Sequence, residues 1–173
     1  MNLAYKHLLP AHFAPESRVW IYQSSRRFLI AEALELEETL NNFSASWTSH
    51  GARVKGFATL FFGQFIVLMA DETQAGVSGC STDSSVRMIK GIEEEYKVQL
   101  FDRQMLAFVV EEKIQLLPLS QLQYAVENKF IQHHTLYFNN LVADKDALEK
   151  EWIIPAGESW LSKRVNFDTA AIR

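Results

Sequence analysis

A stretch without charge, residues 57–70, is the feature that most constrains the fold of this chain. It reads FATLFFGQFIVLMA, contains no Asp, Glu, Lys or Arg, and is interrupted only at Gly63 and Gln64. The β-branched and aromatic residues on both sides of that interruption predict two strands, 54–62 and 64–71, joined as a tight hairpin. A strand with one face in water alternates apolar and polar residues, so both faces of this hairpin require cover.

Four further elements surround the hairpin. Residues 18–23 are β-branched and aromatic, which predicts a strand. Between 29 and 47 apolar residues recur at intervals of four and three, which predicts a helix with one buried stripe. The stripe consists of Leu29, Ala33, Leu36, Leu40, Phe43 and Trp47. After a loop at 72–80, Ser81 or Thr82 with Asp83 predicts the N-cap of a second helix, and residues 105–110 predict a fourth strand.

The order of these elements predicts an α+β protein with a ferredoxin-like βαββαβ core at 17–110, an antiparallel sheet with two helices on one face. Such helices leave the other face open, so we expect an α/β C-terminal extension at 111–162, or a second copy of the chain, to cover it. The extension is predicted to hold strands at 114–117 and 135–138. A helix opened by Ser120 and Gln123 and a short helix capped by Asp144 and ended by Pro155 complete it. We expect a single domain at 1–173 with a tail at 163–173.

Composition excludes several classes of function. The net charge of −4 argues against nucleic acid or an anionic membrane as partner, because both select clustered Lys and Arg. The one cysteine allows no internal disulfide, which is typical of a reducing compartment. The N-terminal residues lack a signal-peptide pattern and the charge-free stretch is too short to span a bilayer. We therefore expect a cytoplasmic protein.

No strong catalytic motif is present. The sequence contains no G-x-x-x-x-G-K-[ST], G-x-G-x-x-G, G-x-S-x-G, C-x-x-C or H-E-x-x-H, so we predict no cofactor. His133 and His134 are adjacent and on a strand would face opposite ways, so they do not form a metal site. We interpret these histidines as structural or solvated, and no metal is predicted. Arg26 and Arg27 could hold a phosphate or be simply solvated.

The most distinctive loop, GVSGCSTD at 76–83, runs directly into the second helix. In the predicted topology it lies at the same sheet edge as the turn 48–51. Cys80, His50 and Asp71 could then converge as nucleophile, base and orienting carboxylate, with Asp83 as the alternative orienter. The competing interpretation is a small buried Cys80, a helix-capping His50 and an Asp71 that bonds loop amides.

The same edge suggests a site for a small anionic ligand. Backbone N–H groups and the positive end of the helix dipole favour an anion at the N-terminus of the second helix. We assign Arg18, Trp47, Gly79, Ser81 and Asp83 as candidate ligand-binding residues because the predicted fold places them around this edge.

Several segments resemble a family of short bacterial proteins often labelled "ABC transporter ATPase". The segments are SRVWIYQS at 17–24, Trp47 with His50 and Gly51, SGCSTDSSV at 78–86, FNNLV at 138–142 and ESW at 158–160. The resemblance spans most of the chain and implies a cytosolic protein, but it implies no activity or catalytic residue. The label itself requires a phosphate-cradling P-loop with its lysine, which this sequence lacks, so ATP hydrolysis is set aside.

Three functional hypotheses follow. The first is an α+β domain that binds a small ligand or a protein, with homo-oligomer formation suggested by the charge-free hairpin. The second is a cysteine-dependent enzyme that uses Cys80 and His50. The third is a phosphate-bearing metabolite bound at the N-terminus of the helix after Cys80.

Overall fold

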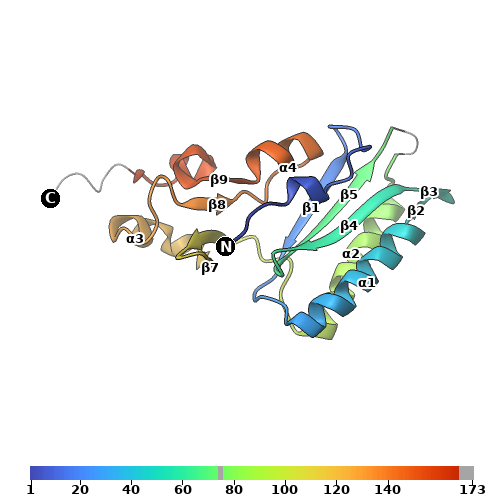
Figure 1. The fold of residues 1–173 in the computed structure, drawn as a ribbon, viewed down its shortest axis with the longest axis horizontal. Helices are drawn as coiled ribbons and strands as arrows, with labels where there is room; N and C mark the ends of the chain where they lie inside the picture. The colour runs from blue at the N-terminus through green and yellow to red at the C-terminus, as the bar shows by residue number, and fades with distance from the viewer. Residues whose placement is uncertain (74–75, 168–173) are drawn as a thin grey trace. The chain divides into compact units, whose positions relative to one another are not determined.

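The computed structural model describes residues 1–73 and 76–167, which form two compact units (Figure 1). The N-terminal unit comprises residues 2–101 and 141–149, and the C-terminal unit comprises Met1, 102–140 and 150–173. Residues 74–75 of the predicted loop and 168–173 of the predicted tail lie outside the described residues. The protein is α+β with antiparallel sheets, as expected from the sequence.

The N-terminal unit is built on a three-stranded antiparallel sheet in the order β1-β5-β4, beside a separate two-stranded hairpin of β2 and β3. Every residue of the central strand β5 is buried, so both faces of this strand of the predicted hairpin are covered, whereas the edge strand β4 is only partly buried. Its turn uses Phe62 and Gly63 at positive φ (56° and 66°), and the Gln64 N–H donates to the Phe61 carbonyl. The elements of this unit are η1 (Lys6–Leu8), β1 (Arg18–Gln23), α1 (Ile30–Ser46), β2 (Thr48–Ser49), β3 (Ala52–Arg53), β4 (Lys55–Phe61), β5 (Phe65–Asp71) and α2 (Gly79–Tyr96).

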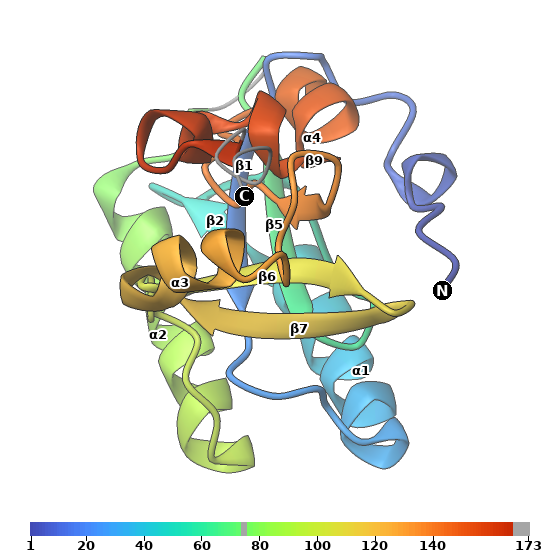
Figure 2. The same cartoon turned by 90° about the vertical axis from the view of Figure 1, so that its left-hand side faces the viewer.

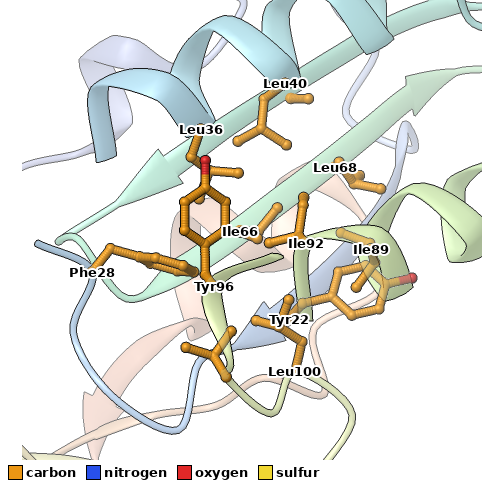
Figure 3. Close-up of a cluster of buried hydrophobic side chains, with 12 residues drawn as sticks. Tyr22, Phe28, Leu36, Leu40, Ile66, Leu68, Ile89, Ile92, Tyr96 and Leu100 are labelled. Carbon is orange, nitrogen blue, oxygen red and sulfur yellow. The ribbon is translucent and has the colours of Figure 1, made fainter. Parts of the chain in front are cut away.

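Both long helices pack on one face of this sheet. Leu36 and Leu40 of α1 meet Ile89 and Ile92 of α2 over the even-numbered residues of β4 and β5, such as Ile66 (Figure 3). The predicted stripe of α1 is therefore the buried one, except at Leu29, which precedes the helix and is exposed. Because both helices pack on the same face, the ends of α1 and α2 lie on the same side of the sheet.

The opposite face of the sheet is lined by the N-terminal segment, residues 2–16. The ring of Tyr5 contacts Phe61 edge-on at 5.7 Å between ring centroids, and its hydroxyl donates to the Leu148 carbonyl. Lys145 donates to the Phe13 carbonyl at 3.0 Å. No role for this segment was predicted from the sequence, and of the C-terminal third only residues 141–149 belong to this unit.

The ferredoxin-like arrangement is not confirmed, because the predicted fourth strand does not join this sheet. Strand β6 (Met105–Val110) has the predicted bounds but pairs with β7 and β8 in the C-terminal unit. At the outer edge of β1 the Val19 N–H instead donates to the Ala143 carbonyl at 2.9 Å. A hairpin closed by two residues costs much less loop entropy than pairing with a strand some 80 residues earlier, which favours β6 with β7.

The C-terminal unit holds a four-stranded antiparallel sheet in the order β7-β6-β8-β9, in which the long β6–β7 hairpin lies beside α3 (Figure 2). Its core includes Leu106, Phe108, Leu122, Ala125 and Leu161. The remaining elements are β7 (Lys113–Pro118), η2 (Leu119–Gln121), α3 (Leu122–Glu127), β8 (Leu136–Phe138), α4 (Lys145–Glu151), β9 (Ile153–Pro155), η3 (Ala156–Glu158) and η4 (Trp160–Lys163). Of α4, residues 145–149 belong to the N-terminal unit.

Two boundaries in this region differ from the prediction. The Ser120 and Gln123 capping box is wrong, since α3 begins after a 3₁₀ turn and has no side-chain cap hydrogen bond. Asp144 caps α4 as predicted by accepting from the Ala147 N–H at 2.8 Å. The helix ends at Glu151, however, and Pro155 lies in the strand β9.

Candidate functional site

The two turns that were predicted to be neighbours do meet at one sheet edge of the N-terminal unit. The Ser78 N–H donates to the Ser49 hydroxyl at 3.2 Å, which joins the start of α2 to the β2–β3 hairpin. The Trp47 indole donates to the Ser81 carbonyl at 3.0 Å, a second hydrogen bond between these two parts of the chain. The juxtaposition inferred from the order of the elements is therefore correct for turns 48–51 and 78–81.

Cys80 and His50 both lie at the surface of this edge. Cys80 is exposed on the first turn of α2, and His50 is exposed in the β2–β3 turn with a φ of 49°. Within the described residues no hydrogen bond joins the two side chains. The N-cap of α2 is Ser78, whose hydroxyl accepts from the Ser81 N–H, and not Ser81 or Thr82 as predicted. The buried alternative for Cys80 does not hold, while its pairing with His50 stays a prediction.

Asp71 is engaged elsewhere. Its carboxylate is 2% exposed and accepts from the Lys55 ammonium, from both donors of Thr73 and from the Ala14 N–H. The hydrogen bond from Lys55 lowers the pKa of Asp71 far below its usual range, with Thr73 and Ala14 acting in the same direction and burial opposing them. These contacts anchor the N-terminal segment to the sheet. Asp83, exposed on the first turn of α2, is the carboxylate at this edge that is open to solvent.

The candidate ligand-binding residues divide into interior and surface groups. Trp47 and Ser81 are 2% and 0% exposed, and their polar groups bond within the fold. Gly79 and Asp83 are exposed on the first turn of α2. Ser81 and Trp47 therefore hold the edge together, whereas Gly79 and Asp83 could be reached by a ligand.

Arg18 belongs to an aromatic stack at the same edge. Its guanidinium lies 4.8 Å above the Trp20 ring, which meets Trp47 edge-on at 5.9 Å. One nitrogen of Arg18 also lies 3.5 Å from the Glu72 carboxylate. Glu72 partly neutralises the charge of Arg18, and the guanidinium stacks on Trp20. Arg18 therefore contributes to the packing of this edge and not to the binding of a free anion.

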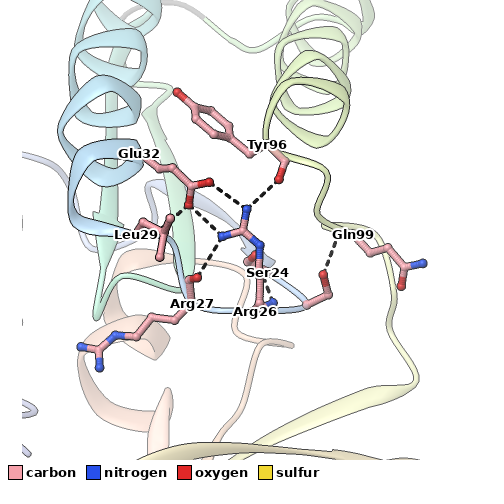
Figure 4. A network of polar contacts seen from close by, with 8 residues as sticks. Ser24, Arg26, Arg27, Leu29, Glu32, Tyr96 and Gln99 are labelled. Atoms are coloured by element: carbon pink, nitrogen blue, oxygen red, sulfur yellow. Dashed lines mark hydrogen bonds and ion pairs between the residues drawn. The ribbon is translucent and has the colours of Figure 1, made fainter.

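Arg26, of the basic pair at the other end of the unit, serves the fold. Arg26 makes a bidentate ion pair with Glu32, at 2.7 and 2.8 Å, and also donates to the Tyr96 carbonyl at 2.7 Å (Figure 4). The hydrogen bond from Arg26 lowers the pKa of Glu32 to about 2, assisted by the Leu29 N–H. Arg26 thus joins the start of α1 to the end of α2, which removes it as a phosphate ligand.

A cleft with basic walls opens in the C-terminal unit. It has a volume of about 500 Å³, and its lining within residues 1–73 and 76–167 includes Lys163, Arg164 and His133 but no Asp or Glu. The lining residues are Gln123, His133, Gly157, Ser162, Lys163, Arg164, Val165, Asn166 and Phe167. In a chain of net charge −4, the adjacent Lys163 and Arg164 are a local concentration of positive charge.

Two buried apolar residues, Leu161 and Val165, flank the segment that carries Lys163 and Arg164. Leu161 is fully buried and Val165 is 7% exposed, and both belong to the core of this unit. Residues 162–164 between them are exposed. The Ser159 hydroxyl accepts from the Leu161 N–H and fixes the start of η4. The Lys163 and Arg164 side chains are therefore held at the surface by a rigid turn.

Tyr137 and Trp160 brace the same turn. The Trp160 indole donates to the Tyr137 hydroxyl at 3.1 Å. Burial raises the pKa of Tyr137 to about 12, so this hydroxyl stays neutral at physiological pH.

The opposite wall depends on a glycine. The Gly157 N–H donates to the His133 carbonyl at 2.9 Å, in the turn just beyond the β8–β9 ladder. A Cβ atom at position 157 would overlap the His133 ring, so only glycine lets the imidazole lie across the backbone here. The His133 ring also meets Phe167 edge-on at 6.2 Å.

Sequence reasoning did not find this cleft. His133 was interpreted as structural or solvated, and Lys163 was assigned to a tail. The available signal was the consecutive basic pair at 163–164 directly after an aromatic and apolar segment. The partner histidine lies some 30 residues earlier, and only the β8–β9 pairing brings it to the same place.

Comparison with known proteins adds no assignment. No family model, curated protein or solved structure matches the chain. Among the described residues, no group of three or more His, Cys, Asp or Glu side chains could hold a metal ion. No helix in the described part of the chain has the length and apolar character needed to cross a membrane.

Proposed function

We propose that this protein binds a small anion, a carboxylate or a phosphate ester, in the cleft of its C-terminal unit. The observation that carries the proposal is the convergence of Lys163, Arg164 and His133 on one cleft, to whose lining the described part of the chain contributes no acidic residue. This develops the small-ligand-binding hypothesis and moves the anion from the N-terminus of α2 to the C-terminal unit.

The three basic groups have complementary chemistry. The guanidinium of Arg164 can donate two parallel hydrogen bonds to a carboxylate or phosphate, and Lys163 adds a mobile point charge. The Gln123 amide donates one N–H to the Glu127 carboxylate at 2.7 Å, which leaves its second N–H to orient the ligand, while the Ser162 hydroxyl already donates to the Ser159 carbonyl at 2.8 Å. All of these side chains are open to water, so each contact contributes only about 1 kcal/mol. Three or four such contacts correspond to a dissociation constant on the order of 1 mM.

Isothermal titration with inorganic phosphate and with malonate, at low ionic strength, tests the proposal. We expect saturable binding in the millimolar range that weakens as NaCl is added, because the contacts are charged and exposed. Replacing both charges, Lys163→Gln with Arg164→Gln, should weaken binding at least about tenfold, the equivalent of roughly 1.4 kcal/mol.

A matched control removes the same charge elsewhere in the unit. Arg103→Gln with Lys113→Gln also lowers the net charge by two, and both residues are exposed and outside the cleft lining. This control should keep the affinity of the unmodified protein. Equal loss in the two double variants would show only a general effect of net charge and would refute the cleft.

A second candidate is a cysteine-dependent activity at the other unit. The observation that favours it is the hydrogen bond between Ser78 and Ser49, which brings the His50 turn beside the loop that precedes Cys80. An imidazole that activates the thiol would make alkylation by iodoacetamide rapid near pH 7, and His50→Gln would slow it. A rate that rises only above about pH 8 and is equal in both proteins would exclude this activity.

The single, exposed thiol also supports a cytoplasmic location, since such a group persists in a reducing compartment. Fractionation of cells that produce the tagged protein tests this part of the proposal. Recovery in a periplasmic or secreted fraction would contradict it.

A further inference from the structure

Helix α1 carries an unusual apolar surface on its outer side. Leu29, Ile30 and Leu34 are 66%, 84% and 69% exposed, although all three are large aliphatic residues. Ile30 and Leu34 are four residues apart and so share one side of the helix, while Leu36 and Leu40 occupy the buried side. Single exposed leucines are common on protein surfaces, but three within two helical turns form a contiguous patch of the kind found at interaction sites.

All the charged side chains that α1 itself carries are negative. Helix α1 contains four glutamates and no Lys or Arg. Glu32 is paired with Arg26, and Glu37 accepts from the Leu60 N–H at the edge strand β4. Glu35 and Glu38 are exposed, and neither forms an ion pair within the described residues.

Helix α2 adds to the same negative field. Glu95 of α2 is exposed, and together with Glu35 and Glu32 it acts on the Tyr96 hydroxyl between the helices. These charges, with burial as the largest cause, raise the pKa of Tyr96. The outer surface of the first turns of α1 is therefore apolar in its centre, with Glu35 and Glu38 beside it on the helix, while the exposed Arg27 lies just before the patch in the chain.

We infer that this surface, Leu29, Ile30 and Leu34 with Glu35 and Glu38, docks a cationic amphipathic segment of another protein. The partner would place aliphatic side chains on Ile30 and Leu34 and its Lys or Arg residues against Glu35 and Glu38. Charge complementarity selects this occupant. A second copy of the chain docked through the same patch would bring the two sets of glutamates together, and this like-charge contact disfavours self-association.

Two synthetic peptides of roughly 14 residues test this inference, since that is about the length at which an amphipathic helix becomes stable. One has leucines at helical spacing with lysines elsewhere, and the other has glutamates in place of the lysines. Binding of each labelled peptide to the full chain is measured by fluorescence anisotropy. We expect the lysine peptide to bind and the glutamate peptide not to bind.

Variants then assign the binding to the patch. Ile30→Gln with Leu34→Gln should weaken the lysine peptide about tenfold or more, because two buried aliphatic contacts are lost. Glu35→Gln with Glu38→Gln should also weaken it and should flatten its dependence on NaCl. Leu141→Gln and Glu16→Gln are the matched controls, since both residues are exposed and outside α1. Circular dichroism checks that each variant keeps its fold.

Several outcomes would overturn the inference. Equal binding of the two peptides would remove charge complementarity, and unchanged binding by the patch variants would place the interaction elsewhere. The absence of binding by the lysine peptide would contradict it directly. A dimer detected by light scattering and dissociated by Leu34→Gln would show that the occupant is a second copy.

Discussion

Replacing Lys55 by methionine should destabilise the N-terminal unit, because it leaves the buried Asp71 carboxylate without its cation. Asp71 is 2% exposed and Lys55 is its one charged partner among the described residues. Methionine keeps most of the apolar stem of lysine, so the change removes charge more than volume. The loss is therefore electrostatic and its size can be worked out from the contacts.

Three interactions disappear in Lys55→Met. The hydrogen bond to the His12 carbonyl, at 3.0 Å, is exposed and water can replace it, so the other two set the size of the loss. A hydrogen bond between charged groups contributes about 1.5–3 kcal/mol. The ammonium also lies 4.9 Å from the Phe13 ring, a cation–π contact worth about 0.5–1 kcal/mol. Thr73 and Ala14 still donate to the carboxylate, which prevents the full cost of an unpaired buried charge. The expected loss in the free energy of unfolding is about 2–4 kcal/mol.

Guanidinium-induced unfolding at pH 7, followed by the fluorescence of Trp20 and Trp47 in the same unit, measures this loss. Lys90→Met is the matched control, since Lys90 is exposed on α2, and it should change the free energy by less than about 0.5 kcal/mol. Combining Lys55→Met with Asp71→Asn should cost less than the sum of the single changes by more than about 1 kcal/mol, because the two residues interact.

The effect of Lys55→Met should also depend on pH. The pKa of Asp71 is lower in the folded protein than in the unfolded chain, where it is about 3.9. Its stabilising contribution is therefore complete above about pH 4 and is lost as the pH falls toward the folded value. The difference between the unmodified protein and the variant should shrink below about pH 4. A variant as stable as the control at pH 7, or strictly additive changes in the double variant, would refute the reasoning.

Three further outcomes are expected. Glu111 and Glu112 form the β6–β7 turn at positive φ (49° and 59°), so replacing them by Asn and Gly should raise the free energy of unfolding by about 0.5–1 kcal/mol in guanidinium titrations; a decrease would contradict the strain. The pKa of Glu32 is about 2 in the folded protein. Between about pH 4.3 and pH 2 the unmodified protein should therefore lose more stability in thermal melts than the Glu32→Gln variant. Parallel curves for the two proteins would show that the Arg26 pair does not cause the loss of stability in acid. Gly157→Ala should displace the His133 ring and weaken phosphate or malonate roughly 2–10-fold by titration, the equivalent of one lost hydrogen bond, and unchanged affinity would remove His133 from the proposed site.

The elements that depend on local pattern could be predicted from the sequence. The charge-free run at 57–70 predicted a hairpin buried on both faces, and β5 is buried throughout. The periodicity of α1 identified Leu36 and Leu40 as core residues. The order of the elements placed the turn 48–51 beside 78–81, as the bond between Ser49 and Ser78 confirms. Each of these results follows from the period of a helix or strand and from the antiparallel direction of neighbouring strands.

The pairing partners of the later strands could not be predicted in the same way. Strand β6 has the predicted bounds, yet it pairs with β7, because a two-residue turn makes that pairing cheap in loop entropy, and its other edge pairs with β8. The N-terminal segment lacks any periodic pattern, and its place on the sheet depends on single contacts such as Tyr5 with Phe61 and Ala14 with Asp71. Contacts between residues this far apart in the chain produce no periodic pattern in the sequence.

The sequence by itself determined the α+β class and the main helices and strands, since these depend on neighbours within a few residues. Only the tertiary structure decided that Asp71 is held by Lys55, that Ser81 and Trp47 are interior, and that His133 lies beside Lys163 and Arg164. The physical reason is that the polarity of a side chain does not specify its partner. A carboxylate or an imidazole can face water, an ion or another chain segment, and the packing of distant segments selects among them.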